Sequence, residues 1–467
     1  MRPARTVLTA GPVVVAVALG YVALLHWAYV VYIAPVFSYL QYAYRPPDPV
    51  GYGVALALVA GLALLMPRRI VRPSQFIVWV LFIITVIPSL VVPQWAPALS
   101  YSEALQLTVW VGVCFGLVVG LGTHRTLREF VPRYPLPAHT YRLVVGAVFV
   151  ALMGYAVAVT GLDLSLPSLD DVYGVRGEFR SEAAANPALA YAFPLLETLI
   201  SPMMVAFGLW DRRPLWVLAG VVGQLYIYAA EGSKTAFFSP LAIALVFLLV
   251  RRGRAMIGSV ALLGAAGIVV AAIAIGDTSL FVRRLLITPG LVTAGYVRVF
   301  DDAPKAHLAH SVLSRFLDYP YDADPADVVG RWFFGNPQTH ANTGWLGDGY
   351  ANFGYPGMLA ASVILVVVLW MIDDATKGLP LGYACLFVLP HALTLCESAI
   401  LTSILTHGIF VAIVLAALAP REGWRRTGSL VGDDPGGTQP ELRREVLMKP
   451  AATRTRVTSS VDATGVR

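Results

Sequence analysis

Two carboxylates and one histidine are the residues of this sequence best suited to acid–base chemistry. His340 and Asp348 lie in the stretch 335–357, where small and polar residues alternate with aromatic residues. His340 could act as a general base near neutral pH, although a histidine alone in a loop is more often a hydrogen-bonding residue. Glu197 stands inside an apolar segment, where a carboxylate is costly unless it has a function or pairs with an arginine. We therefore take these three as the candidate catalytic residues.

Six cationic residues are suited to binding an anionic group. A guanidinium matches phosphate oxygens with two parallel hydrogen bonds, and a lysine adds a point charge. For any single arginine, pairing with nearby acids is the alternative, and Lys234 is equally suited to pairing with Glu231 across a short turn. The candidate diphosphate-binding residues are Arg176, Arg180, Lys234, Arg283, Arg284 and Arg298.

The stretch 335–357 also offers side chains suited to sugars. Aromatic rings can stack on sugars, amides can donate and accept hydrogen bonds, and glycines permit close backbone approach to a ligand. The candidate glycan-binding residues are Asn342, Trp345, Tyr350 and Asn352. The sequence has no metal-ligand cluster, and its three cysteines lie in or beside apolar segments. We expect no metal and no cofactor.

The composition indicates what kind of protein must position these residues. Of the 467 residues, 57% are hydrophobic and 13% are charged, whereas a soluble chain carries about 25% charged residues. These values exclude a soluble multidomain enzyme, a nucleic-acid-binding protein and a disordered protein. A membrane-crossing helix needs about 20 mostly apolar residues. We expect an all-α polytopic membrane protein with about twelve transmembrane helices: 13–33, 50–66, 76–93, 103–121, 142–161, 189–209, 215–230, 236–250, 256–275, 356–372, 379–394 and 400–419.

The distribution of basic residues predicts the orientation in the membrane. Short cytoplasmic loops carry an excess of lysine and arginine. With the N-terminus inside, only ten of the 34 basic residues fall on the outer side, while most acids fall there. Both termini are therefore expected in the cytoplasm. The outer basic residues are Arg45, Arg176, Arg180, Lys234, Arg283, Arg284, Arg298, Lys305, Arg315 and Arg331.

Two long outer loops and a polar tail divide the chain. A transmembrane domain over 1–420 contains the outer loops 161–188 and 276–355, and loops of this length are usually functional or disordered. The second loop is rich in aromatic residues, so we expect it to be ordered, and Leu308, Val312 and Phe316 predict a short interfacial helix within it. The first apolar segment reads as a retained anchor, and 421–467 as a disordered, basic cytoplasmic tail.

The runs NTGWLGDGYANFG (342–354), EGSKTAFFSPL (231–241) and VRRLLITPGLVTAGYVRVF (282–300) resemble motifs of oligosaccharide repeat-unit polymerases of the O-antigen polymerase type. The run NTGWLGDGYANFG at 342–354 resembles the family's closing motif, and EGSKTAFFSPL at 231–241 resembles its cation-bearing turn. The segment 282–300 resembles the arginine-led start of the family's large outer loop. His340 with Asn342 is also similar to the His-x-Asn/Ser pattern of the related O-antigen ligases, which tend to carry arginine where this sequence has Lys234.

The resemblance implies a metal-independent membrane glycosyltransferase that makes exopolysaccharide or other cell-surface polysaccharide of the cell envelope. Its substrate would be an oligosaccharide on a polyprenyl diphosphate such as undecaprenyl diphosphate, held in the bilayer and used on the outer face of the cytoplasmic membrane. A flippase and a chain-length regulator of the same pathway are candidate partners. A ligase or another polyprenyl-linked-donor glycosyltransferase is the alternative among enzymes. Outside the enzymes the alternatives are a polysaccharide or lipid transporter, for which no internal repeat is evident, and a membrane scaffold or sensor.

Overall fold

The computed structural model describes residues 7–124, 129–162, 165–167, 172–251, 258–310 and 316–424. All regular elements within these ranges are helices. Nine helical segments of the described residues are long and apolar enough to cross a membrane, and three shorter apolar helices accompany them. The expected all-α polytopic membrane fold is confirmed.

The helices often contain π-helical turns (η), where one extra residue widens the helix. In chain order they are α2 (Gly11–Ala28), η1 (Tyr29–Ile33), α3 (Ala34–Phe37), η2 (Ser38–Leu40, a 3-10 turn), α4 (Pro49–Leu65), α5 (Pro73–Leu81), η3 (Phe82–Val86), α6 (Ile87–Trp95), α7 (Tyr101–Gly122), α8 (Ala138–Thr160), α9 (Val172–Ala185), α10 (Leu189–Leu195), η4 (Leu196–Ile200), α11 (Ser201–Trp210), α12 (Pro214–Glu231), α13 (Lys234–Arg251), α14 (Gly258–Ala274), η5 (Ser279–Ile287), α15 (Thr288–Asp302), α16 (Pro325–Trp332), α17 (Trp345–Thr376), α18 (Leu381–Glu397), α19 (Ile400–Leu405) and α20 (Ile409–Leu418).

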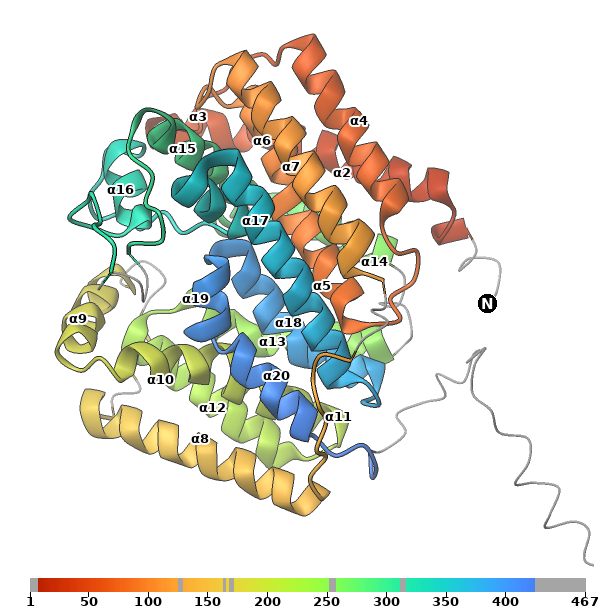
Figure 1. Ribbon diagram of the computed structural model, residues 1–467, viewed down its shortest axis with the longest axis vertical. Helices are drawn as coiled ribbons and strands as arrows, with labels where there is room; N and C mark the ends of the chain where they lie inside the picture. Colours follow the sequence, from red (N-terminus) through yellow and green to blue (C-terminus); the bar gives the residue numbers. More distant parts are fainter. Residues whose placement is uncertain are drawn as a thin grey trace, which may run out of the picture. The chain divides into compact units, whose positions relative to one another are not determined.

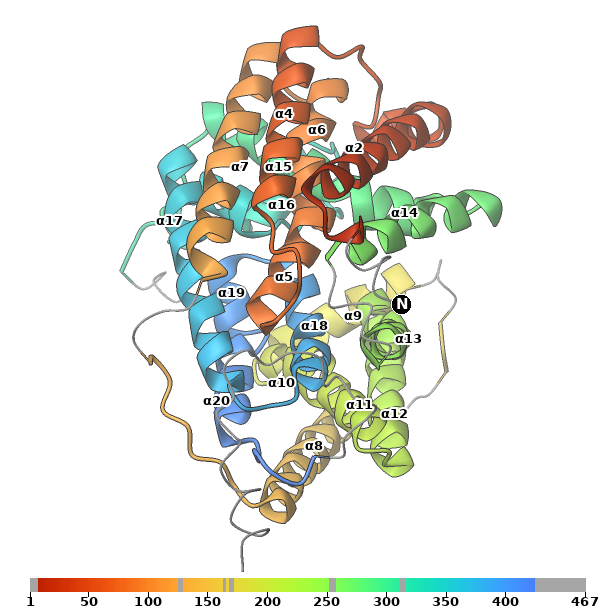
Figure 2. The ribbon, with the colours of Figure 1, turned by 90° about the vertical axis from the view of Figure 1, so that its right-hand side faces the viewer.

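The helices form two groups that α18 joins. In one group α7 packs on α4 and α17, and α15 packs on α6 and α17. In the other group α11 packs on α12 and α13, and α18 contacts both α11 and α5. Figure 2 shows α2 and α14 side by side next to the first group, with α8, α11 and α12 together lower down.

The connections between helices gather on two sides of the protein. We call one side the loop face: it carries the connections 38–48 and 96–100, where the Arg45 amide donates to the Trp95 carbonyl, together with α9 and α16 (Figure 1). The opposite face carries the connections 66–72 and 129–137, which meet the end of α17. Figure 1 shows α17 running from the loop face to the opposite face.

Charged residues hold the connections of the opposite face together. Ser74 donates to the Asp373 carboxylate through its amide at 2.9 Å and its hydroxyl at 2.7 Å. Glu129 accepts from Lys377 and from Arg133, both at 2.9 Å. These hydrogen bonds, with that of Lys377 the stronger influence, lower the pKa of Glu129 to about 2.

An additional long helix lies inside the expected loop 276–355. The span from Ser279 to Asp302 is apolar enough to cross a membrane, but it was not among the twelve expected segments. At the start of α15 the Thr288 and Tyr42 hydroxyls share a hydrogen bond of 2.6 Å, and near the end of the span Tyr350 donates to Asp301 at 2.9 Å. These bonds join the middle of the span to the connection 38–48 and its end to the first half of α17. The expected loop 276–355 thus contains an additional candidate membrane span.

A kink divides α17 into two helices. Phe353 and Gly354 have non-helical backbone angles, and Gly354 has φ +66°, a value that favours glycine. Across the kink Gly349 and Gly357 touch so closely that a Cβ on Gly357 would overlap the Gly349 carbonyl oxygen. The expected membrane helix at 356–372 is therefore preceded by a separate buried helix from Trp345 to Asn352.

Two expectations concern the boundaries of the described chain. The tail was expected to begin at 421, but Arg421 donates to the carbonyls of Ala375 (2.7 Å) and Ala416 (3.0 Å). The Trp424 ring lies 4.5 Å from that of Tyr383. The packed part of the chain thus continues through Trp424, and 425–467 lies outside the described residues. The expected interfacial helix around Val312 falls on 311–315, which also lies outside them.

Candidate functional site

Glu197 lies in the π-helical turn η4 between α10 and α11. Single π-helical turns within α-helices occur often at functional sites, because the extra residue redirects a side chain. Here the Glu197 carboxylate is half-buried and accepts a hydrogen bond from the Ser233 hydroxyl. The backbone carbonyl of Glu197 accepts from the side-chain amide of Gln224 at 2.7 Å. The sequence placed Glu197 in a helix, and the structure adds the polar partners that hold it.

The turn that faces Glu197 is built by capping residues. Gly232 ends α12 with φ +69°, and its amide donates to the Tyr228 carbonyl. Ser233 caps α13, since its hydroxyl accepts from the Ala236 amide at 3.3 Å. Lys234 is the first residue of α13. The motif at 231–234 therefore places a hydroxyl and an ammonium group at adjoining positions.

Arg176 reaches the same turn from α9. Its Nε donates to the Gly232 carbonyl at 3.3 Å, and its charge interacts with Glu197. Arg180 lies one helical turn further along α9, and its side chain is outside the described residues. Of the expected cations, Arg176 thus reaches the turn that bonds Glu197, and Lys234 directly follows Ser233 in that turn.

A second carboxylate, which the sequence did not single out, joins this group. Glu397 is the last residue of α18, it is exposed, and its charge interacts with those of Glu197 and Arg176. In the sequence Glu397 is only one acid among many after an apolar segment. The charges of two carboxylates from different helices therefore interact with that of one guanidinium; we call Arg176, Glu197, Ser233, Lys234 and Glu397 the two-carboxylate site.

The stretch that precedes α17 adjoins this site. A Cβ on Gly344 would lie 2.8 Å from the Leu395 carbonyl oxygen and 3.0 Å from that of Cys396. The N-terminus of α17 is thus in contact with the end of α18 next to Glu397. Asn342, two residues before Gly344, is exposed, and its backbone N–H donates to the His340 backbone carbonyl at 3.0 Å.

His340 is oriented by a carboxylate. Its Nδ1 lies 2.6 Å from Oδ1 of Asp327, in the first turn of α16, and both side chains are about one-third exposed. A carboxylate that bonds one ring nitrogen fixes the orientation of the imidazole and leaves the other nitrogen available. The sequence offered no reason to pair His340 with Asp327, because their spacing of thirteen residues depends on the turn between α16 and α17.

Three of the four expected glycan-binding residues lie in the core. Trp345 is fully buried and donates to the Ser362 hydroxyl at 3.1 Å, so its ring cannot stack on a sugar. Tyr350 is buried against Asp301. Asn352 donates to Asp348 at 3.1 Å and accepts from the Leu308 amide at 2.7 Å. Asn342 is the exposed member of the set.

Asp348 likewise has a structural environment. Its carboxylate is 7% exposed and is bonded by Asn352 within the same helix. Its charge interacts with the Tyr296 hydroxyl of α15 rather than with Glu197 or Glu397. Asp348 therefore lies apart from the two-carboxylate site.

The remaining cations divide between the two ends of the helix Ser279–Asp302. The Arg283 guanidinium lies 4.2 Å from the Phe37 ring centroid and donates to Ser279 at 2.9 Å. The ring centroid of Phe281 lies 5.6 Å from that of Phe238 on α13. Arg283 and the exposed Arg284 therefore lie on the element next to the helix that begins at Lys234. Arg298, at the other end, pairs with Asp302 at 3.6 Å. Arg298 is thus separate from the other cations.

Two basic groups of the 303–310 connection are affected by burial. Burial lowers the pKa of Lys305, and Asp301 partly offsets this effect; the ammonium lies 4.4 Å from the Tyr350 ring centroid. Burial also lowers the pKa of His310, which Asp324 partly offsets. Both residues pack on the loop-face helices and favour their neutral forms more than free side chains do.

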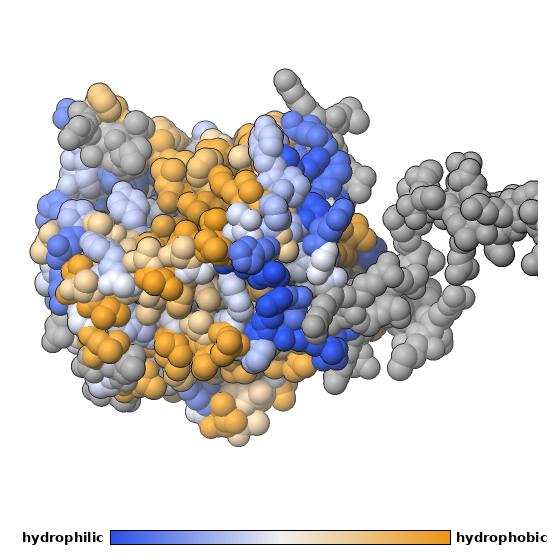
Figure 3. Space-filling view, turned by 90° about the horizontal axis from the view of Figure 1, so that it is seen from below, coloured by the Kyte–Doolittle hydropathy of each residue, from blue (hydrophilic) through white to orange (hydrophobic). Residues whose placement is uncertain are grey.

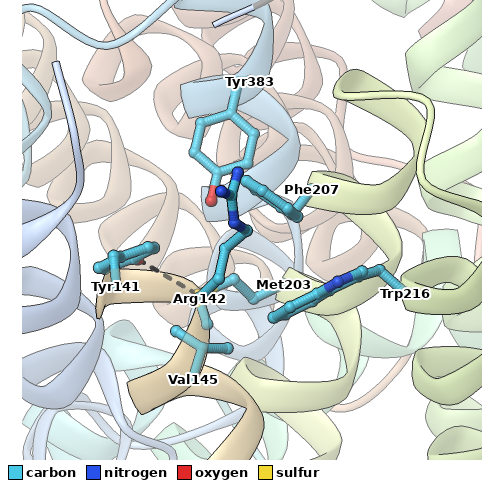
Figure 4. A pocket seen from close by; sticks show the side chains of 7 residues that line it. All are labelled: Tyr141, Arg142, Val145, Met203, Phe207, Trp216 and Tyr383. Atoms are coloured by element: carbon cyan, nitrogen blue, oxygen red, sulfur yellow. Dashed lines mark hydrogen bonds between the residues drawn. The ribbon is translucent and has the colours of Figure 1, made fainter. Parts of the chain in front are cut away.

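The opposite face carries a small pocket. It lies between α8, α11, α12 and α18 (Figure 4), and none of the expected site residues lines it. Its lining residues are Tyr141, Arg142, Val145, Met203, Phe207, Trp216 and Tyr383. Among the described residues no group of three or more histidines, cysteines, aspartates and glutamates is placed to hold a metal ion.

In the two-carboxylate site, an expected cation, the expected carboxylate Glu197 and the newly found carboxylate Glu397 meet on the loop face. Its chemistry suits anion binding together with proton removal. Comparison with family models, with curated proteins and with solved structures finds no match to this chain.

Proposed function

We propose that this protein is a membrane glycosyltransferase that polymerises oligosaccharide repeat units carried on a polyprenyl diphosphate. The observation that supports this proposal is the two-carboxylate site, where the charges of Glu197 and Glu397 interact with that of Arg176 at the loop-face ends of membrane helices. Arginine and lysine suit a diphosphate, and a carboxylate suits the activation of a sugar hydroxyl. A lipid-linked diphosphate donor needs the cations to hold its diphosphate, and the acceptor sugar needs the carboxylate to remove its hydroxyl proton.

In the proposed reaction a sugar hydroxyl of one lipid-linked unit attacks the anomeric carbon of another. The new glycosidic bond forms while the bond from that carbon to the diphosphate oxygen breaks. Glu397, the exposed carboxylate, takes the hydroxyl proton, and the polyprenyl diphosphate leaves with the bonding electrons. Arg176 and Lys234 stabilise the charge that develops on the diphosphate. We propose a metal-independent reaction, since these side chains supply the positive charge.

The proposal includes a location. The loop face would lie on the outer side of the cytoplasmic membrane, with both termini in the cytoplasm, because the basic residues of the sequence concentrate in the connections of the opposite face. The lipid of the substrate would lie in the bilayer and its sugars above the loop face. Products would enter a cell-surface polysaccharide.

Substitutions of the two carboxylates test the proposal. In a membrane assay with the lipid-linked repeat unit, Glu397→Gln is expected to lower polymer formation about 10²–10⁴-fold, the usual contribution of a general base. Glu197→Gln can still accept the hydrogen bond from Ser233 but no longer interacts with the charge of Arg176. It is expected to lower polymer formation about tenfold. Asp48→Asn, at the N-cap of α4, is the control. Wild-type activity of Glu397→Gln would disprove the assigned role.

A ligase that moves a finished glycan is a second candidate, because His340 bonded to Asp327 is poised as a base beside Asn342. The two functions differ in what accumulates when the gene is deleted. A polymerase leaves a single repeat unit on its lipid carrier, whereas a ligase leaves full-length polymer that is not attached to its acceptor. An unchanged glycan profile would disprove both.

A further inference from the structure

The π-helical turns of the described residues are all followed by a proline at the same place. In η1, η3, η4 and η5 the turn ends, one residue follows, and the next residues are Pro35, Pro88, Pro202 and Pro289. A proline within an α-helix clashes with the carbonyl four residues earlier and donates no N–H. The residue before each proline instead donates to the carbonyl five residues earlier, as Ser201 does to Leu196. The next carbonyl of each turn would need the N–H that proline lacks.

In η4 the carbonyl left without this donor is that of Glu197, and Gln224 supplies one from another helix. The side-chain amide of Gln224, on α12, donates to the Glu197 carbonyl at 2.7 Å. Ser233, in the turn after α12, donates to the carboxylate of the same residue. Glu197 is therefore held at its backbone and at its side chain by one pair of connected helices. In η3 the corresponding carbonyl, that of Ile83, lies 3.5 Å from the Tyr21 hydroxyl.

Gln224 lies on the inner side of a helix whose outer side is apolar. Leu215, Leu218 and Val222 are the exposed apolar residues of α12. Figure 3 shows a broad apolar surface on the underside of the protein as drawn in Figure 1, where α8, α11 and α12 lie together. Gln224 is 0% exposed, and its Oε1 finds no hydrogen-bond partner among the described residues. A buried amide that is only half satisfied contributes little to stability, so its bond to Glu197 explains its position better.

We propose that Gln224 is a positioning residue of the two-carboxylate site. Its amide replaces the backbone donor that Pro202 lacks and fixes the π-helical turn, and it thereby sets where the Glu197 carboxylate meets Ser233 and Arg176. The effect of Gln224 on polymer formation rests on the proposed function, whereas its effect on the carboxylate of Glu197 does not.

Removal of the amide tests the role in the reaction. Gln224→Met keeps the length of the side chain and exchanges one unsatisfied buried acceptor, Oε1, for another, the Glu197 carbonyl. The melting temperature in detergent should therefore stay close to that of the wild type. The kcat/KM for polymer formation, per folded protein, should fall about tenfold, as expected for Glu197→Gln. Pro202→Ala restores an N–H five residues after Glu197, so Gln224→Met with Pro202→Ala should recover most of this loss. Tyr21→Phe, which removes the corresponding donor at η3, is the matched control and should change neither value.

The reactivity of Glu197 tests the positioning without any enzyme assay. The purified full-length protein is treated with dicyclohexylcarbodiimide, an apolar reagent for carboxyl groups, and modified Glu197 is quantified by mass spectrometry. We expect Gln224→Met to react a few-fold faster than the wild type, because Ser233 and Arg176 no longer shield the carboxyl group. Tyr21→Phe should react as the wild type does.

The two measurements separate this proposal from the proposed function. Equal carbodiimide reactivity of Gln224→Met and the wild type would overturn the positioning role. The role would also be overturned by wild-type kcat/KM of Gln224→Met, or by a double variant with Pro202→Ala that recovers no activity. A wild type that makes no polymer, while its carbodiimide reactivity differs from that of Gln224→Met as expected, would disprove the proposed function and support the positioning role.

Discussion

Arg176 is the residue on which the charge balance of the two-carboxylate site depends. Its guanidinium is fixed by the Gly232 carbonyl and interacts with both Glu197 and Glu397. Two neighbouring carboxylates without a cation repel each other, so removal of Arg176 affects the acids as well as the anion site. Arg176 therefore links diphosphate binding to the protonation state of Glu197 and Glu397.

Replacement of Arg176 by lysine separates charge from geometry. Arg176→Ala is expected to abolish polymer formation, whereas Arg176→Lys keeps the charge but loses the planar fork and is expected to retain a few per cent of activity. The measurement is polymer yield from membranes at equal protein amounts. Arg331→Lys, whose native arginine pairs with Asp322 at 3.2 Å on α16, is the matched control. Full activity of Arg176→Lys would show that charge alone suffices.

The pairing of His340 with Asp327 predicts non-additive effects. If His340 takes part in proton transfer or substrate binding, His340→Ala and Asp327→Asn should each lower activity, with the asparagine variant losing less, about tenfold. The double variant should lose no more than His340→Ala alone, since Asp327 acts through the imidazole. Gln338→Ala, in the same connection, should leave activity unchanged. Multiplicative losses in the double variant would contradict the orienting role of Asp327.

The structure places Arg176 and Glu197 near one another, as the predicted site requires, whereas three of the four expected sugar contacts are buried. Arg176 and Lys234 are close together because helix caps place them, and caps leave recognisable residues such as Gly232 and Ser233. Trp345 and Tyr350 were expected to face a glycan, but they belong to a buried helix whose aromatic residues face its neighbours. Glu397 was missed because its partners lie on two other elements far away in the sequence.

At the scale of elements, length and apolarity predicted where helices lie, but they did not predict the additional span inside the expected outer loop 276–355. Each of the twelve expected segments corresponds to a helix. The helix Ser279–Asp302 was missed because it carries several charges and its mean hydropathy of 1.3 is the lowest among the candidate spans. Whether such a helix crosses or lies on one side depends on what its ends contact, and single-sequence patterns do not contain that information.

The kink of α17 depends on glycine–glycine contact. The backbones of its two halves meet at Gly349 and Gly357, where a side chain on either residue would overlap a carbonyl group. Gly357→Ala is expected to destabilise the protein by about 1–3 kcal/mol through overpacking, measured as a lowered melting temperature in detergent. Gly154→Ala is the control, because a Cβ there meets open space. An unchanged melting temperature of Gly357→Ala would contradict this close packing.

His310 gives the 303–310 connection a pH dependence. Because burial lowers its pKa below 6.5, the unfolded chain takes up the proton at a higher pH than the folded protein does. Stability is therefore expected to fall as the pH drops from about 6.5 through the lowered folded-state pKa. His310→Gln should show a smaller loss of melting temperature between pH 7.5 and 5.5. A slope identical to that of the wild type would exclude this contribution.

At the scale of the whole molecule, the two faces differ in their charge and in their chemistry. The opposite face joins its connections through Glu129, Lys377 and Asp373, and the loop face carries the two-carboxylate site. From the positive-inside bias, the sequence predicts that the opposite face is cytoplasmic and the loop face is the outer one. The native cysteines, Cys114, Cys385 and Cys396, are buried, so introduced cysteines can report which face is outside.

Labelling with a membrane-impermeant maleimide tests the orientation. Ser102→Cys lies on the loop face at the start of α7, and Val71→Cys lies on the opposite face; both positions are exposed. In intact cells we expect labelling of Ser102→Cys only, and after permeabilisation labelling of both. The wild type should remain unlabelled under either condition because its cysteines are inaccessible. The reverse pattern would place the two-carboxylate site in the cytoplasm, where it could not act on units displayed at the cell surface.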